Sequence, residues 1–134
     1  GDKTIGNGHA FYELGTVSGM HSIFPREGKE DIRQTTVPMI TLDDYCMVNK
    51  LMPDLIKIDV EGAENLILEG ARNILAKSSP EIFLSVHPRQ LARQGLTMDV
   101  FKEFVHSFGY QWYSADGDLL GDGLPTFGEY ILRK

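Results

Sequence analysis

The sequence is poor in cysteine and has no long apolar run. A single cysteine, Cys46, excludes an internal disulfide framework. No stretch reaches the roughly 18 apolar residues of a membrane-spanning helix, and no signal-peptide pattern opens the chain. Lys and Arg number 13 against 19 Asp and Glu, and the net charge of −6 argues against binding to a phosphate backbone. We therefore expect a soluble, cytoplasmic protein that binds neither nucleic acid nor membranes.

Several common catalytic signatures are also missing. The sequence has no HExxH, CxxC, GxSxG or P-loop motif, and no glycine-rich cofactor loop. The segment Gly6-Asn7-Gly8 does not replace that loop, because it leads into a predicted strand and not into a helix. Apolar residues nevertheless make up 42% of the 134 residues, which is enough for a globular core.

The middle of the chain predicts a strand–helix–strand unit. Apolar strands are expected at residues 55–59 and 81–86. Between them, one helix is expected to carry a continuous apolar stripe of residues spaced three and four apart: Ala63, Leu66, Ile67, Gly70, Ala71, Ile74 and Leu75. Such a crossover joins parallel strands and is almost always right-handed. The predicted fold class is therefore α/β, with a parallel βαβ unit.

Shorter elements are expected on both sides of this unit. Upstream, the pattern predicts strands at residues 9–14 and 35–40, a long loop at 15–34, and a helix that begins after Thr41 and reaches about Lys50. Downstream, a polar segment at 89–95 precedes a helix from Thr97 to Gly109. Strands at 110–113 and 129–132 are then expected to form a terminal antiparallel hairpin.

The residues that can carry chemistry gather where the two parallel strands end. Ligands of open α/β sheets bind at the carboxyl ends of the strands. Asp59 closes the first strand, Glu61 follows it, and His87 closes the second. Lys57 shares a strand face with Asp59. These carboxylates can bind a ligand or act as bases, and a histidine can accept a proton from a hydroxyl near neutral pH.

Each of these residues also has a simpler structural interpretation. Glu61 and Glu64 can complement a helix N-terminus, worth about 0.3–1 kcal/mol, and for Glu64 this role is favoured. Lys57 can extend to solvent or pair with Asp59 or Glu61, and His87 can cap its strand. Three of these residues, Asp59, Glu61 and His87, can in principle ligate a metal, but their spacing is no specific metal signature, and no metal is expected.

Four stretches resemble the FkbM-type methyltransferases. The most specific is IKIDVEGAE at residues 56–64, followed by LEGA at 68–71. VPMITLDD at 37–44, GMHSI at 19–23 and PEIFLSVH at 80–87 agree with the same family. The sequence departs from it at Ser85, where the family usually has a carboxylate, and this leaves the role of the neighbouring His87 open.

This resemblance implies a Rossmann-like class I fold that uses S-adenosylmethionine to methylate hydroxyl groups of small molecules or sugars. Asp59 and Val60 would border the methionine end of the cofactor. Glu61, Lys57 and His87 would face the acceptor hydroxyl as catalytic residues. His21 and Ser22, in the long loop, would contact the acceptor substrate.

The resemblance further implies that residues 1–134 form the C-terminal part of such a domain. Within it, residues 1–34 hold a strand and the long loop, 35–87 the core, and 88–134 a helix and the hairpin. The family's glycine-rich loop lies upstream, so this segment alone is expected to be inactive, with a sheet edge that favours self-association. Two alternatives stay open: a metal-assisted methyltransferase, and a non-catalytic binding or assembly module that keeps the half-fold.

Overall fold

The computed structural model describes residues 9–14 and 32–134 and divides the chain into two compact units, Gly1–Ile40 and Thr41–Lys134. The first unit contains strands β1 (His9–Leu14) and β2 (Ile32–Val37), which pair antiparallel. The second strand thus begins and ends three residues before the predicted 35–40. Pro38 follows its last residue, and proline has no N–H group to donate to a strand ladder. The rest of the predicted loop, residues 15–31, lies outside the described residues.

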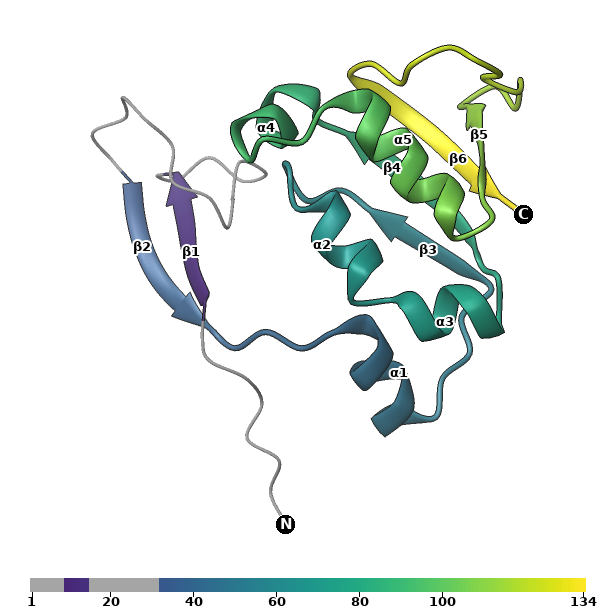
Figure 1. Ribbon diagram of the computed structural model, residues 1–134. Helices are drawn as coiled ribbons and strands as arrows, with labels where there is room; N and C mark the ends of the chain where they lie inside the picture. Colours follow the sequence, from purple (N-terminus) through teal and green to yellow (C-terminus); the bar gives the residue numbers. More distant parts are fainter. Residues whose placement is uncertain (1–8, 15–31) are drawn as a thin grey trace. The chain divides into compact units, whose positions relative to one another are not determined.

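The second unit is built on an open four-stranded sheet with the order β3-β4-β6-β5. Its strands are β3 (Leu55–Ile58), β4 (Glu81–Val86), β5 (Gln111–Ser114) and β6 (Gly128–Arg133). Strands β3 and β4 run parallel, whereas β6 pairs antiparallel with both β4 and β5. The predicted α/β class, the parallel pair and the terminal hairpin are therefore confirmed (Figure 1).

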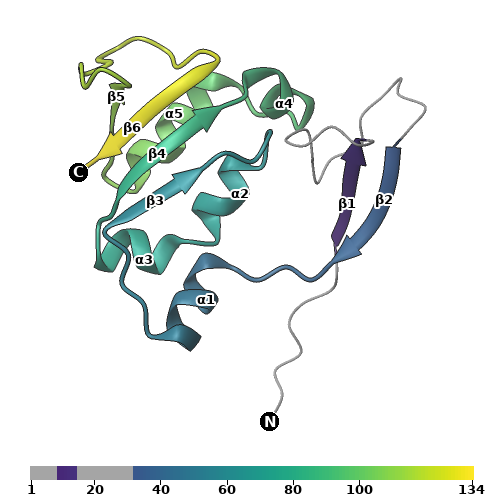
Figure 2. The same cartoon turned by 180° about the vertical axis from the view of Figure 1, so that it is seen from behind.

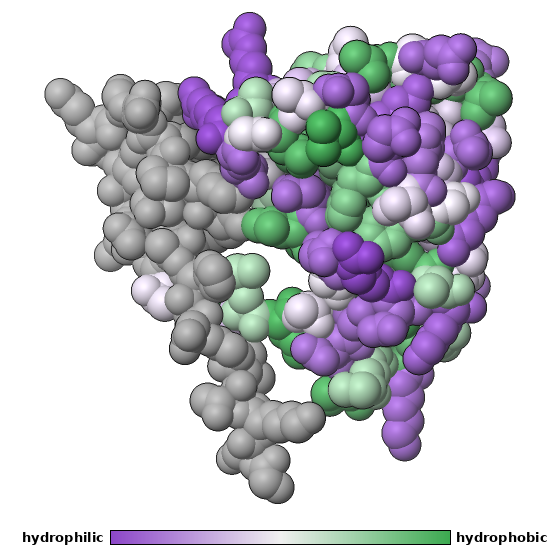
Figure 3. All heavy atoms as spheres, viewed as in Figure 1, coloured by the Kyte–Doolittle hydropathy of each residue, from purple (hydrophilic) through white to green (hydrophobic). Residues whose placement is uncertain are grey.

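Five helices accompany the sheet in this unit: α1 (Leu42–Asn49), α2 (Glu64–Glu69), α3 (Arg72–Lys77), α4 (Pro88–Arg93) and α5 (Met98–Ser107). Helices α2, α3 and α5 lie on one face of the sheet, in front of it in Figure 1 and behind it in Figure 2. The surface seen from that side mixes hydrophilic and hydrophobic residues (Figure 3). None of the helices among the described residues is long and apolar enough to cross a membrane.

The prediction of a single helix between β3 and β4 is wrong, because the structure breaks it into α2 and α3 at Gly70 and Ala71. Glycine is a poor helix former, and the Asp43 side chain provides hydrogen-bond acceptors for backbone N–H groups in the first turn of α3. Its carboxylate accepts hydrogen bonds from the backbone N–H groups of Asn73 and Ile74, each at 2.9 Å. The break also changes the buried face: Leu66, on the predicted stripe, is 44% exposed, whereas Leu68 is buried.

The prediction of a polar segment without a helix at residues 89–95 is also wrong, since most of this segment belongs to helix α4. Pro88 occupies the first turn of this helix, where its missing N–H group costs nothing. Leu91 anchors the helix, as its side chain is fully buried. One apolar anchor in six residues gives too short a pattern for helical periodicity to be recognised.

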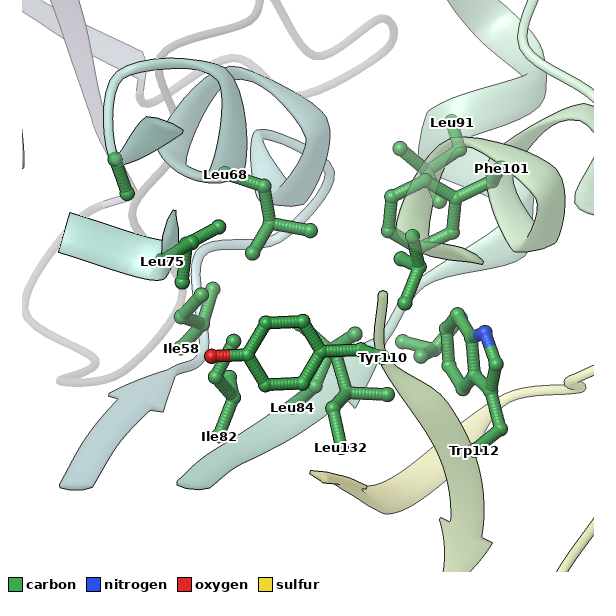
Figure 4. Close-up of a cluster of buried hydrophobic side chains, with 13 residues drawn as sticks. Ile58, Leu68, Leu75, Ile82, Leu84, Leu91, Phe101, Tyr110, Trp112 and Leu132 are labelled. Atoms are coloured by element: carbon green, nitrogen blue, oxygen red, sulfur yellow. The ribbon is translucent and has the colours of Figure 1, made fainter. Parts of the chain in front are cut away.

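The core lies between the sheet and its helices, as Figure 4 shows. Ile58 of β3, Ile82 and Leu84 of β4 and Leu132 of β6 point toward helix residues that include Leu68, Leu75 and Phe101. Trp112 of β5 meets the Phe101 ring edge-on at 5.8 Å between centroids. This core holds β3 and β4 side by side and thereby fixes where their carboxyl ends lie.

Candidate functional site

The parallel pairing of β3 and β4 brings the predicted site residues to one edge of the sheet. Ile58, the last residue of β3, pairs with Leu84 of β4, three residues before His87. The turn after β3 and the residue after β4 therefore emerge at the same edge (Figure 2). This is the place where ligands of α/β sheets bind.

A buried acid–histidine pair lies at this edge. Glu64, the first residue of α2, is 0% exposed, and His87 is 6% exposed. Oε1 of Glu64 lies 2.6 Å from Nδ1 of His87 and also accepts the Gly62 N–H at 3.1 Å. Its other oxygen, Oε2, is buried and has no hydrogen-bond partner among the described residues. A carboxylate buried this deeply needs the imidazole N–H, because an unpaired buried charge is costly.

Glu61 completes the cluster from the turn between β3 and α2. Its Oε1 lies 3.8 Å from Nε2 of His87, on the side of the ring opposite Glu64. Its backbone has φ +53°, a left-handed conformation that costs a non-glycine residue energy and that occurs often at functional sites. The turn therefore holds Glu61 in a strained conformation that aims its carboxylate at the histidine.

Gly62 and helix α4 support this turn. Gly62 has φ +106°, and a Cβ atom added there would lie 2.4 Å from Cβ of Gln90, so only glycine fits. This confirms the tight backbone predicted at Gly62. The Gln90 amide donates to Oε2 of Glu61 at 3.3 Å, and the Gln94 amide donates to the Gly62 carbonyl. Helix α4 and its C-cap residue Gln94 thus contact both the acid and the glycine of the turn.

Asp59, Val60 and Lys57 lie beside this cluster in a more open environment. Nζ of Lys57 is 3.9 Å from Oδ2 of Asp59, which is one of the pairings expected from their shared strand face. The two side chains are 68% and 48% exposed, so the ion pair adds little stability. Val60 is half-buried against the core. The Asp59 carboxylate is thus open to solvent at the end of β3.

Near the end of β4, Ser85 contacts a carboxylate of the neighbouring strand β6. Ser85, buried in β4, lies opposite Glu129 of β6. Its hydroxyl donates to the Glu129 carboxylate at 2.8 Å. A third acidic side chain thus reaches the end of β4, two residues before His87.

Sequence reasoning identified Glu61, Asp59 and His87 but missed the role of Glu64. The signal lay in the spacing, because Glu64 stands four residues before the buried Leu68 on the corrected inner face of α2. Gln90 and Gln94 were missed together with α4. The predicted substrate contacts His21 and Ser22 lie outside the described residues. Residues 9–14 and 32–134 contain no group of three or more His, Cys, Asp or Glu side chains arranged to hold a metal ion.

The second unit is thus an open α/β sheet with an acid–histidine cluster at the carboxyl edge of its parallel strands. The family model described as "Methyltransferase FkbM domain" matches residues 2–112, most of the chain. The chain therefore belongs to the FkbM methyltransferase family, and the resemblance inferred from the sequence is confirmed. Searches of curated proteins and of solved structures gave no match.

Proposed function

We propose that this methyltransferase uses S-adenosylmethionine to methylate a hydroxyl group of a small molecule. Family membership supports methyl transfer in general. The observation that carries the assignment to a hydroxyl is the buried contact of Glu64 with Nδ1 of His87, with Nε2 turned toward Glu61. A hydroxyl oxygen must lose its proton as it takes up the methyl group, and this arrangement supplies an acceptor for that proton.

The tautomer of His87 follows from its contact with Glu64. In the neutral imidazole, an Nδ1–H donated to Oε1 of Glu64 leaves the lone pair on Nε2. In this proposal the hydroxyl donates its one hydrogen bond to Nε2, which takes the proton. The imidazolium that forms is then stabilised by Glu64 at Nδ1 and by Glu61, whose Oε1 lies 3.8 Å from Nε2.

Asp59 and Val60 fit the cofactor role that the resemblance implies. The Asp59 carboxylate is about half exposed at the end of β3 and can accept hydrogen bonds from an ammonium group. Val60 offers apolar surface next to it, and Lys57 orients the Asp59 carboxylate through their ion pair. When bound, S-adenosylmethionine supplies an electrophilic methyl group. The protein then contributes the alignment of the acceptor oxygen and its deprotonation.

Matched acceptors test whether oxygen is the methylated atom. Release of S-adenosylhomocysteine by the full-length protein is measured with a naphthol, the corresponding naphthylamine and methyl glucoside. We expect release with a hydroxyl acceptor and none with the amine. Release with the amine alone would contradict O-methylation. Absence of release with any acceptor, together with absence of cofactor binding, would favour the non-catalytic module.

Replacement of the histidine tests the proposed base. We expect His87→Gln to lower kcat by about 100-fold or more, because general base catalysis contributes about 10²–10⁴-fold. Glu64→Gln should also lower kcat, since the orientation of the His87 ring depends on that carboxylate. His106→Gln is the control, because His106 also faces a glutamate, Glu103 at 3.7 Å, but on helix α5. Equal kcat values for the His87 and His106 variants would refute the role of His87.

Two further expectations remain predictions. Strand β3 is an edge of the described sheet, so self-association through that edge stays open to test. The cytoplasmic location expected from the composition is likewise a prediction, which fractionation of cells that express the full-length protein can check.

A further inference from the structure

A cavity of about 780 Å³ opens in the second unit between helix α4, the start of α5 and the connection from β5 to β6. Its size falls within the roughly 300–1,000 Å³ of small-molecule sites. Most of its lining is apolar and comes from Pro88, Met98, Leu124, Pro125 and Phe127. The cavity therefore has the size and the chemistry of a pocket for an apolar ligand.

The cavity adjoins the acid–histidine cluster. The Phe127 ring, which is part of its lining, meets the His87 ring edge-on with 5.7 Å between the centroids. Pro88 follows His87 directly in the chain, and the amide of Gln90, another lining residue, donates to Glu61. A ligand in this cavity therefore lies next to the side chains proposed to receive the hydroxyl.

We propose that this cavity holds the body of the acceptor, and that the acceptor is a largely apolar, ring-bearing alcohol or phenol and not a sugar. This inference rests on the proposed function, because it assigns the substrate class of the same site. It chooses among acceptors that the sequence alone left open. Among the lining residues that the structure describes, Arg89 is the one charged side chain, and its positive charge further disfavours a cationic acceptor.

The polar groups of the lining explain why a sugar is disfavoured. The Gln90 amide is engaged with Glu61, and the N–H of Thr126 donates to the Tyr130 hydroxyl at 2.8 Å. Apart from the exposed Arg89, the described lining offers few partners for the several hydroxyl groups of a sugar, and some of these groups would stay unpaired. An apolar ring would instead cover Leu124 and Phe127, which are 52% and 76% exposed, and would remove that apolar surface from water.

A binding experiment tests this inference without any methyl transfer. A naphthol and methyl glucoside are each titrated calorimetrically into the full-length protein and into two variants. Leu124→Asp places a charge in the cavity lining. Leu119→Asp is the matched control, because Leu119 lies in the same β5–β6 connection, is 59% exposed and is not among the residues that line the cavity.

We expect the naphthol to bind the parent and the Leu119→Asp variant equally, and Leu124→Asp to weaken its binding by about tenfold or more. Methyl glucoside should bind at least about tenfold more weakly than the naphthol to the parent. Tighter binding of methyl glucoside, or equal binding of the naphthol by both variants, would overturn the inference. Because binding is read directly, naphthol binding without methylation would contradict the proposed function and leave the pocket assignment standing.

Discussion

Tyr110 is a single buried residue whose polar hydroxyl group is satisfied by a hydrogen bond inside the core. Its side chain is 1% exposed, and its hydroxyl donates to the Pro80 carbonyl at 2.8 Å. Burial raises the pKa of Tyr110 to about 12 from the ordinary value of 10.0, because the phenolate is disfavoured away from water. The hydroxyl therefore ties the start of β5 to the start of β4 as long as it keeps its proton.

This raised pKa predicts a loss of stability in alkali. Between the unfolded pKa near 10 and the folded pKa near 12, the folded protein binds more protons at Tyr110 than the unfolded chain, so its stability falls as pH rises. Tyr110→Phe should cost about 1 kcal/mol at neutral pH and flatten the pH dependence in that window. Urea unfolding measured across the window checks this. A pH dependence unchanged in the variant would show that Tyr110 is not responsible.

The candidate site was predictable from the sequence where it depends on strand ends. Asp59 and His87 follow apolar strands, so their placement at the sheet edge needed only the β3–β4 pairing. Glu64 was not recognised, because an acid in the first turn of a helix commonly complements the helix N-terminus. Its burial depends on the packing of the turn after β3 against His87 at the end of β4, 23 residues away in the chain, which a local pattern does not contain.

Among the helices, α3 is capped at its N-terminus by the side chain of a distant residue, Asp43. Both of its oxygens accept backbone N–H groups from the first turn of α3, and this helix has no side-chain cap from its own N-cap residue. Asp43→Ala should therefore cost about 1–2 kcal/mol of unfolding free energy, comparable with the loss of a strong N-cap. The urea unfolding midpoint measures this change.

Asp44→Ala is the matched control for that substitution. Asp44 is the adjacent acid in the first turn of α1 and contributes its backbone N–H to the Thr41 cap. Its loss should cost only about 0.5 kcal/mol through the helix dipole. An equal loss of unfolding free energy in the two variants would mean that the hydrogen bonds from α3 to Asp43 contribute no measurable stability.

The elements that the sequence predicted well are those with strong local patterns. Strand β4 and helix α1 were found at or within a residue of their bounds, because an apolar run and the cap at Thr41 define them locally. Helix α4 was missed, and the helix after β3 was predicted too long. In both cases contacts from other elements, which a local pattern does not contain, decide the outcome.

At the scale of the whole molecule, the α/β class followed from the order of strand and helix patterns. The order β3-β4-β6-β5 did not follow from it, because insertion of β6 between β4 and β5 depends on packing between segments far apart in the chain. That order places the connection from β5 to β6, with Leu124 and Phe127, at the cavity beside His87. The proposed acceptor pocket is therefore a consequence of topology.

The central claim is that this FkbM-family chain belongs to an enzyme that binds S-adenosylmethionine at the end of β3. The most direct measurement is calorimetric titration of S-adenosylhomocysteine into the full-length protein, its Asp59→Ala variant and its Asp54→Ala variant. Asp54 is the matched control, because this exposed acid precedes β3 at the opposite end. We predict binding by the parent and by Asp54→Ala, and at least about tenfold weaker binding by folded Asp59→Ala. No binding by the folded parent, or parental affinity in Asp59→Ala, would contradict the account.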